Sequence, residues 1–131
     1  MARRDWLETL GWDTSHTSEL RHAAYAYIRQ GKYDIALPFF EALVVLEPKS
    51  TYDWQMLGAL YVELNQPEKA IRAFDTALQS EESHGPTLLN LTKAFFMAGK
   101  KEDGVRLAKI LQNDKDPYIA GNASALLMCY T

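Results

Sequence analysis

The chain has 131 residues, of which 47% are hydrophobic and 24% are charged, and its formal net charge is −3. This length predicts one domain, or a short array of repeats, with a buried core. The charge argues against nucleic-acid binding, because the basic pairs Arg3–Arg4 and Lys100–Lys101 are too short to form a patch. No apolar run approaches the ~20 residues that a membrane-spanning helix needs. The single cysteine, Cys129, excludes an intramolecular disulfide and suits a reducing cytoplasm.

The N-terminal segment carries an apolar stripe on a short helix that we predict over Asp5–Gly11. The stripe consists of Trp6, Leu7, Leu10 and Trp12. Two tryptophans are a large apolar surface to leave in water. Two interpretations stay open: the stripe caps the helices that follow, or it forms a surface for self-association or for a partner.

An internal repeat organises the rest of the chain. The stretch GKYDIALPFFEALVVLEP (31–48), shifted by 34 positions, falls on NQPEKAIRAFDTALQSEE (65–82), and a weaker third copy begins at residue 99. Within each unit apolar residues recur at i, i+3, i+4 and i+7, which is typical of amphipathic helices. Each unit therefore predicts a pair of helices that buries its apolar faces against its neighbours.

The residues at the predicted helix ends fit this division. Gly31, Asn65 and Gly99 follow one another at the repeat spacing and fall where the first helix of each pair must end in a tight turn. Pro67 and Pro86 suit the first turn of a helix, where the missing N–H is no loss.

Two other positions give sharper predictions. Ser50 lies three residues before Asp53, which predicts a capping interaction at the start of a helix. Pro38 lies inside the most apolar stretch and removes a backbone donor, so we expect a local kink or a late helix start within 33–37.

Side-chain sizes predict how the helices of a pair cross. In the second unit the small residues Gly58 and Ala70 allow a close approach. In the third unit Gly104 and Ala108 leave less bulk at the crossing, so we expect this unit to be the least stable of the three.

The second unit resembles the tetratricopeptide repeat in nearly every key position. The resemblance implies an all-α fold: a right-handed α-solenoid of three helix pairs with a short N-terminal helix and a C-terminal capping helix. The expected parts are an N-terminal segment (1–16), three repeats (17–50, 51–84 and 85–118) and a capping helix (119–131). The matching residues are Trp54, Leu57, Gly58, Tyr61, Ala70, Phe74 and Ala77.

Candidate catalytic and metal-binding groups are scattered along the chain. His16, His22 and His84 have no cysteine or carboxylate at metal-ligand spacing, and Cys129 has no partner base. The glycines follow the period of the repeat and show no phosphate-loop spacing. We therefore expect a protein that is not an enzyme and that has no metal or cofactor.

The resemblance also implies a partner-binding groove, since the first helix of each pair lines the concave face in this family. The mixture of aromatic, aliphatic and isolated polar side chains suits an extended peptide with spaced hydrophobic anchors. For Ile28, Val62 and Leu89, packing between helices is an equally open interpretation. The expected groove residues are Arg21, Tyr25, Ile28, Tyr52, Gln55, Val62, Leu89, Lys93 and Phe96.

The first half of the chain, LRHAAYAYIRQGKYDIALPFFEALVVLEPKSTYDWQMLGALY (20–61), is similar to the repeat-type chaperones of bacterial type III secretion. This resemblance implies a cytoplasmic protein that holds a small hydrophobic translocator, needle or rod subunit before export. Similar chaperones self-associate through the N-terminal end, which implies a homodimer or heterodimer through Trp6, Leu10 and Trp12. The alternative is a general adaptor for the assembly of protein complexes, with no export role.

Overall fold

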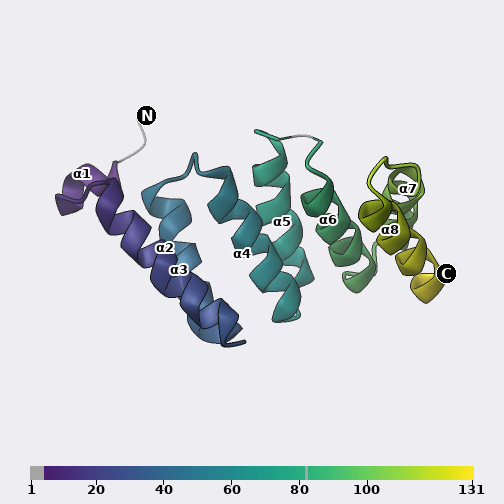
Figure 1. Cartoon of the computed structure of the whole chain (residues 1–131), viewed down its shortest axis with the longest axis horizontal. Coiled ribbons are helices and arrows are strands. Elements are labelled where there is room, and N and C mark those ends of the chain that lie inside the picture. Colours follow the sequence, from purple (N-terminus) through teal and green to yellow (C-terminus); the bar gives the residue numbers. More distant parts are fainter. Residues whose placement is uncertain (1–4, 82) are drawn as a thin grey trace.

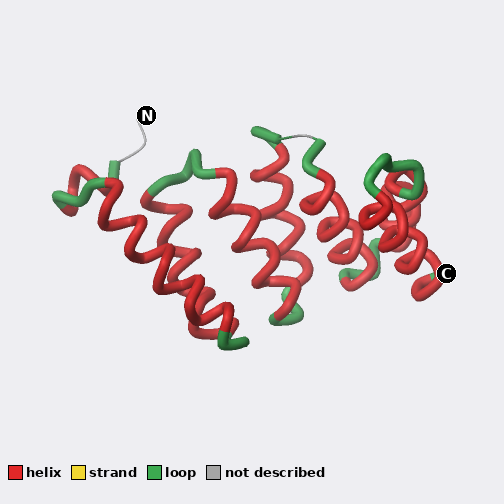
Figure 2. The backbone as a smooth tube through the Cα atoms, in the orientation of Figure 1, coloured by secondary structure: helices red, strands yellow, loops and turns green. Residues whose placement is uncertain are grey.

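The computed structural model describes residues 5–81 and 83–131, which form eight α-helices and no strand. Figure 1 shows the helices as one row, with α2 in front of α3, α8 in front of α7, and the two termini at opposite ends. Figure 2 shows that short loops join the helices. The helices are α1 (Trp6–Leu10), α2 (Thr14–Arg29), α3 (Tyr33–Leu46), α4 (Thr51–Glu63), α5 (Pro67–Leu78), α6 (Gly85–Met97), α7 (Lys101–Leu111) and α8 (Pro117–Tyr130).

The predicted all-helical solenoid is confirmed. Helices α2 and α3, α4 and α5, and α6 and α7 pack as pairs, and each pair contacts the helix that follows it. The first helices also meet directly, because α4 contacts α6 and α6 contacts α8. One apolar core therefore runs through the row, from Ala24 and Phe40 through Phe74 to Leu91, and a smaller cluster joins α7 to α8.

The turns inside the three pairs are built as the sequence predicts. Gly31, Asn65 and Gly99 have φ angles of 73°, 57° and 77°, the left-handed region that favours glycine. Pro67 and Pro86 lie in the first turns of α5 and α6, as predicted.

The short N-terminal helix is also confirmed. The carboxylate of Asp5 caps α1 by accepting the backbone N–H groups of Leu7 and Glu8. Gly11, with a φ of 68°, ends the helix. Helix α1 packs against α3.

The late helix start expected at Pro38 is wrong, because α3 already begins at Tyr33 and Pro38 is its sixth residue. Pro38 lies just past the first turn, so its missing N–H removes a single bond, the one to the Asp34 carbonyl, and leaves the rest of the helix intact. Ala36 and Phe40, on either side of Pro38, are fully buried, and their packing holds the helix in place. The local kink stays a prediction.

In both the second and the third pair a glycine packs against a phenylalanine where the two helices cross, but the two residues exchange helices between the pairs. A Cβ at Gly58 of α4 would lie 2.4 Å from the Phe74 ring of α5. In the third pair the glycine is on the second helix: a Cβ at Gly104 of α7 would lie 2.9 Å from the Phe96 ring of α6. The ring of Phe96 thus fills the space that the small residues of α7 leave.

Among the residues that the structure describes, no helix combines the length and the apolar character needed to span a bilayer.

Candidate functional site

The first helices α2, α4 and α6 carry all nine residues that the resemblance assigns to a groove, and we call their exposed side the first-helix face. Tyr25 and Tyr52 are 46% and 42% exposed, among the most exposed large apolar side chains of the described chain. Lys93 is exposed as well, whereas Arg21, Ile28, Gln55 and Leu89 are half-buried.

Tyr25 and Tyr52 form an aromatic surface over the junction of the first two pairs. The ring of Tyr52 packs edge-on against the buried Phe40, with 6.4 Å between ring centroids and 63° between ring planes. Partial burial, and then the neighbouring Tyr25 phenol, raise the pKa of Tyr52. The two phenols therefore share one environment, although α2 and α4 belong to different pairs.

Beside these tyrosines lies a buried ion pair that the sequence did not reveal. The Nε and Nη2 atoms of Arg21 each donate to a carboxylate oxygen of Asp53, both at 2.7 Å, and Asp53 is fully buried. Glu47, at the end of α3, lies 3.8 Å from the Arg21 guanidinium and accepts the hydroxyl of the buried Thr17. The hydrogen bond from Arg21 to Asp53 raises the pKa of Arg21. Arg21 thus links α2 to α4.

The capping interaction expected between Ser50 and Asp53 is therefore wrong. Ser50 occupies the N-cap position of α4, but its side chain makes no capping hydrogen bond. The carboxylate of Asp53 turns toward Arg21, because a bidentate guanidinium satisfies a buried carboxylate better than a single backbone N–H does.

Gln55 and Leu89 occupy the same place as Arg21 one and two repeats further along. The amide Nε2 of Gln55 lies 3.3 Å from Nδ1 of His84, which is 2.7 Å from the hydroxyl of the buried Thr87. Leu89 packs against the apolar cluster that contains Ile119 of α8. The three positions join successive first helices by an ion pair, by hydrogen bonds and by apolar contact.

Two of the expected groove residues, Val62 and Phe96, are each only 6% exposed. Phe96 stacks on Tyr130 of α8, with 4.7 Å between ring centroids and 4° between planes, and its other side meets Gly104. Both side chains are covered by neighbouring helices and offer little surface to a partner in this structure. Packing is therefore the interpretation that the burial of Val62 supports.

The apolar N-terminal stripe lines a hollow of about 500 Å³ between α1, α2 and the end of α3. Leu10 and Val45 are about half exposed there. The indole of Trp12 stacks on His16, with 5.3 Å between ring centroids. The lining residues are Trp6, Leu10, Trp12, Leu20, Ala42, Val45 and Leu46.

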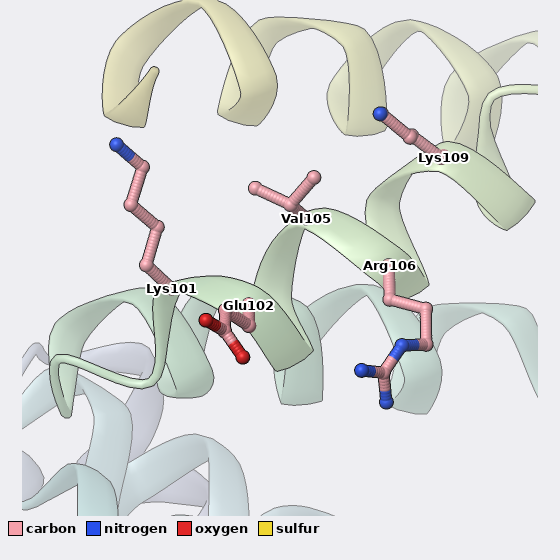
Figure 3. A pocket seen from close by; sticks show the side chains of 5 residues that line it. All are labelled: Lys101, Glu102, Val105, Arg106 and Lys109. Carbon is pink, nitrogen blue, oxygen red and sulfur yellow. The ribbon is translucent and has the colours of Figure 1, made fainter.

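A second hollow, of about 470 Å³, lies on the outer helix α7 and is cationic. Figure 3 shows Lys101, Val105 and Lys109 pointing to one side, toward the neighbouring helix, while Glu102 and Arg106 point away. All five residues belong to a second helix, so this hollow is separate from the first-helix face.

Side chains that could bind a metal do not gather anywhere in residues 5–81 and 83–131: no three His, Cys, Asp or Glu residues form a cluster. Cys129 is exposed near the end of α8.

The fold and the repeat spacing define the class of this protein. The family model described as tetratricopeptide repeat matches residues 12–94, and the chain belongs to that family. Among curated relatives, the PEX5-related protein of Mus musculus is 25% identical over 97 residues, covering 72% of this chain and 17% of the relative. That of Homo sapiens is 26% identical over 94 residues, covering 70% and 15%. The chain thus spans less than a fifth of the length of these relatives.

Three similar solved structures contain a chaperone or belong to a type III secretion complex. One is PcrH in complex with the chaperone binding region of PopD, with a TM-score of 0.78, 17% identity, and coverage of 92% of this chain and 94% of that one. Another is SycD, the type III secretion translocator chaperone of Yersinia enterocolitica, with a TM-score of 0.72, 19% identity and coverage of 94% and 96%. A third belongs to a T3SS complex from Aeromonas hydrophila, with a TM-score of 0.78, 18% identity and coverage of 98% and 89%. These likenesses show the fold.

Proposed function

We propose that the protein is a type III secretion chaperone whose first-helix face holds a segment of a small hydrophobic export subunit, such as a translocator, needle or rod protein, before export. The observation that carries this proposal is the exposed pair Tyr25 and Tyr52 beside half-buried aliphatic side chains. Such anchors suit an extended peptide with spaced apolar residues. The similarity to whole secretion chaperones, including PcrH with a bound region of its partner, supports it.

This function needs no chemistry on the partner. A holding protein acts before export, so we place it in the cytoplasm, and we assign it no catalytic residue, metal or cofactor. The alternative, a general adaptor of complex assembly, uses the same face for a partner with no export role.

The test is co-expression of the tagged chain with the needle, rod and translocator subunits of its own organism. We expect one of them to co-purify with the wild-type chain. The double variant Tyr25→Ala/Tyr52→Ala should lower the amount recovered at least about tenfold, because buried aromatic anchors are each worth about 2 kcal/mol or more at an interface.

The matched control is Ile110→Ala, which removes an exposed aliphatic side chain from the outer helix α7. Recovery should be unchanged, and both variants should keep the helical circular dichroism of the wild type. Full recovery with the double variant would overturn the proposal. Capture of a complex unrelated to secretion, and of no export subunit, would favour the adaptor.

The N-terminal hollow supports a second proposal, self-association through Trp6, Leu10 and Trp12. The hollow of about 500 Å³ has a wholly apolar lining, and exposed apolar surface that gathers in one place is typical of interaction sites. Sedimentation velocity should find a dimer for the wild-type chain and a monomer for Leu10→Glu. A variant that sediments like the wild type, but unfolds earlier in urea, would indicate that the stripe is a cap.

A further inference from the structure

Helix α8 exposes a long uncharged face. Its 14 residues, PYIAGNASALLMCY, include no charged side chain. Ile119 and Ala123 are buried against α6 and α7, whereas Tyr118 and Met128 are 67% and 83% exposed. Gly121 and Ala125 lie between these two on the exposed side.

The burial pattern shows which repeat position α8 occupies. In α4 one buried row consists of Asp53, Leu57 and Leu60, and in α6 the corresponding buried row consists of Thr87, Leu91 and Ala94. In α8 the same spacing gives Ile119, Ala123 and the half-buried Leu126. Thr87 follows Asp53 at the full repeat spacing, whereas Ile119 follows Thr87 two positions short of it. Helix α8 is therefore a first-type helix whose register is two residues early.

This register places the exposed row of α8 on the first-helix face. Counted in the same way, Tyr118 takes the place of Tyr52, and Ala125 takes that of Tyr25. Contacts agree, because α8 touches both helices of the third pair, as α6 touches both helices of the second. Figure 1 shows α8 in front of α7, as α2 lies in front of α3.

We propose that α8 forms the last subsite of the partner-binding face and takes an uncharged, apolar end of the bound segment. The inference rests on the proposed function, since the occupant is the same partner segment. A charged partner residue would find no counter-charge on α8, and its desolvation would be uncompensated. Gly121 has nothing within 4 Å of the place where a Cβ would stand, so a partner backbone can approach closely between Tyr118 and Met128.

The cationic hollow on α7 does not compete for this segment. Lys101 and Lys109 flank Val105 there, and they suit an acidic ligand on the outer helix. An uncharged segment gains nothing from those ammonium groups.

The geometry sets the length of the segment. Packed helices lie about 8–10 Å apart, and α6 contacts both α4 and α8, so the path from α4 across α6 to α8 covers about 16–20 Å. An extended peptide rises about 3.3 Å per residue, and about five or six residues therefore reach from Tyr52 to Tyr118.

The experiment selects ligands from a phage-displayed library of random 12-residue peptides on the immobilised wild-type chain. Binding of the selected peptides is then measured by fluorescence anisotropy. We expect each selected peptide to carry an uncharged apolar end. Gly121→Glu and Ala125→Glu should weaken binding at least about tenfold, and both keep the fold because they replace exposed residues of a helix.

Ile110→Glu is the matched control, since it places the same charge on an exposed position of α7 and should leave binding unchanged. A six-residue peptide that lacks the apolar end should still bind more weakly to Tyr25→Ala/Tyr52→Ala than to the wild-type chain. Its affinity should no longer change with Gly121→Glu.

The outcomes separate the two proposals. Binding that falls with Tyr25→Ala/Tyr52→Ala but not with Gly121→Glu or Ala125→Glu would overturn the α8 subsite and leave the proposed function standing. Selected peptides with charges at both ends would also overturn the subsite. Both proposals would be contradicted if binding is unchanged by the tyrosine double variant, by Gly121→Glu and by Ala125→Glu. A library that yields no ligand would contradict them as well.

Discussion

The first and last junctions between neighbouring first helices use corresponding positions of the repeat and opposite chemistry. Between α2 and α4 the contact is a buried ion pair, Arg21 with Asp53. Between α6 and α8, Leu89 takes the place of Arg21 and packs against the cluster of Ile119, which takes the place of Asp53. The repeat therefore sets where two helices meet, while the individual residues decide whether the contact is polar or apolar.

The difference has an energetic meaning. A buried ion pair is weak evidence for net stability, because the desolvation of both charges offsets their attraction. The ion pair does raise the free energy of any arrangement that separates Arg21 from Asp53, because each charge would then be buried without its partner. The apolar junction lacks such a directional penalty and is stabilised by burial alone.

The largest expected effect is at the ion pair. Arg21→Leu leaves the Asp53 carboxylate buried without its partner, so the free energy of unfolding should fall by about 3–5 kcal/mol in urea denaturation. Arg29→Leu, at an exposed position of the same helix, should change it by no more than about 0.5 kcal/mol. The double variant Arg21→Leu/Asp53→Leu copies the last junction and should recover most of the loss. A single variant as stable as the wild type would remove the contrast between the two junctions.

The next effect concerns the crossings inside the pairs. Gly58→Ala should lower the free energy of unfolding by about 1–3 kcal/mol, because the new methyl group would overlap the Phe74 ring. Both alanines regain about 1 kcal/mol of helix propensity, so the ranking depends on the rings: Gly104→Ala should cost less, since Phe96 lies further away (2.9 Å instead of 2.4 Å). Urea denaturation of both variants measures the difference, and equal losses would contradict this ranking.

A smaller effect is expected at the aromatic stack of the last junction. Tyr130→Ala removes the stack on Phe96, a pair worth about 0.5–1.5 kcal/mol beyond its buried area. Hydrogen exchange should then show faster exchange in α6 to α8 and no change in α2 to α4. Met128→Ala, at an exposed position of the same helix, is the control. In the wild-type chain we expect the third pair to exchange fastest, and protection equal to that of the second pair would contradict this.

The smallest effect depends on pH. Burial, followed by the hydrogen bond from its hydroxyl to Glu41, raises the pKa of Tyr61 to about 12. The folded state thus holds this proton more tightly than the unfolded state, whose tyrosine pKa is about 10. Its contribution is complete below pH 10 and is lost as the pH rises toward 12. Tyr61→Phe should cost about 0.5–1 kcal/mol at neutral pH, and urea titrations should show this cost shrinking above pH 10. A cost that grows above pH 10 would contradict the assignment.

What the sequence predicted well is local. Glycine or asparagine in the three turns, and proline in the first turns of α5 and α6, act through their own backbone geometry, so the period of the repeat was enough to place them. The all-helical solenoid followed from the same spacing. The aromatic surface of Tyr25 and Tyr52 was foreseen by position, and its role in binding stays a prediction.

What the sequence did not predict depends on distant contacts. Asp53 was expected to take part in capping, because no residue near it in the sequence indicates an ion pair with Arg21, which lies almost a full repeat earlier. Phe96 was expected to be exposed, and the stack with Tyr130 could not be foreseen without the register of α8. A step that falls two positions short of the repeat turns the expected face of α8 by about 200°, since each residue rotates a helix by about 100°.

The position of α8 in the array matters to anyone who would lengthen it by design. A consensus repeat joined after Leu111, in place of the loop and helix that follow, continues the regular step of the repeat. The same repeat joined after Tyr130 would place its first helix where a second helix is due, because α8 already packs on α6 and α7 as a first helix does. A design that keeps α8 must therefore continue with a second helix.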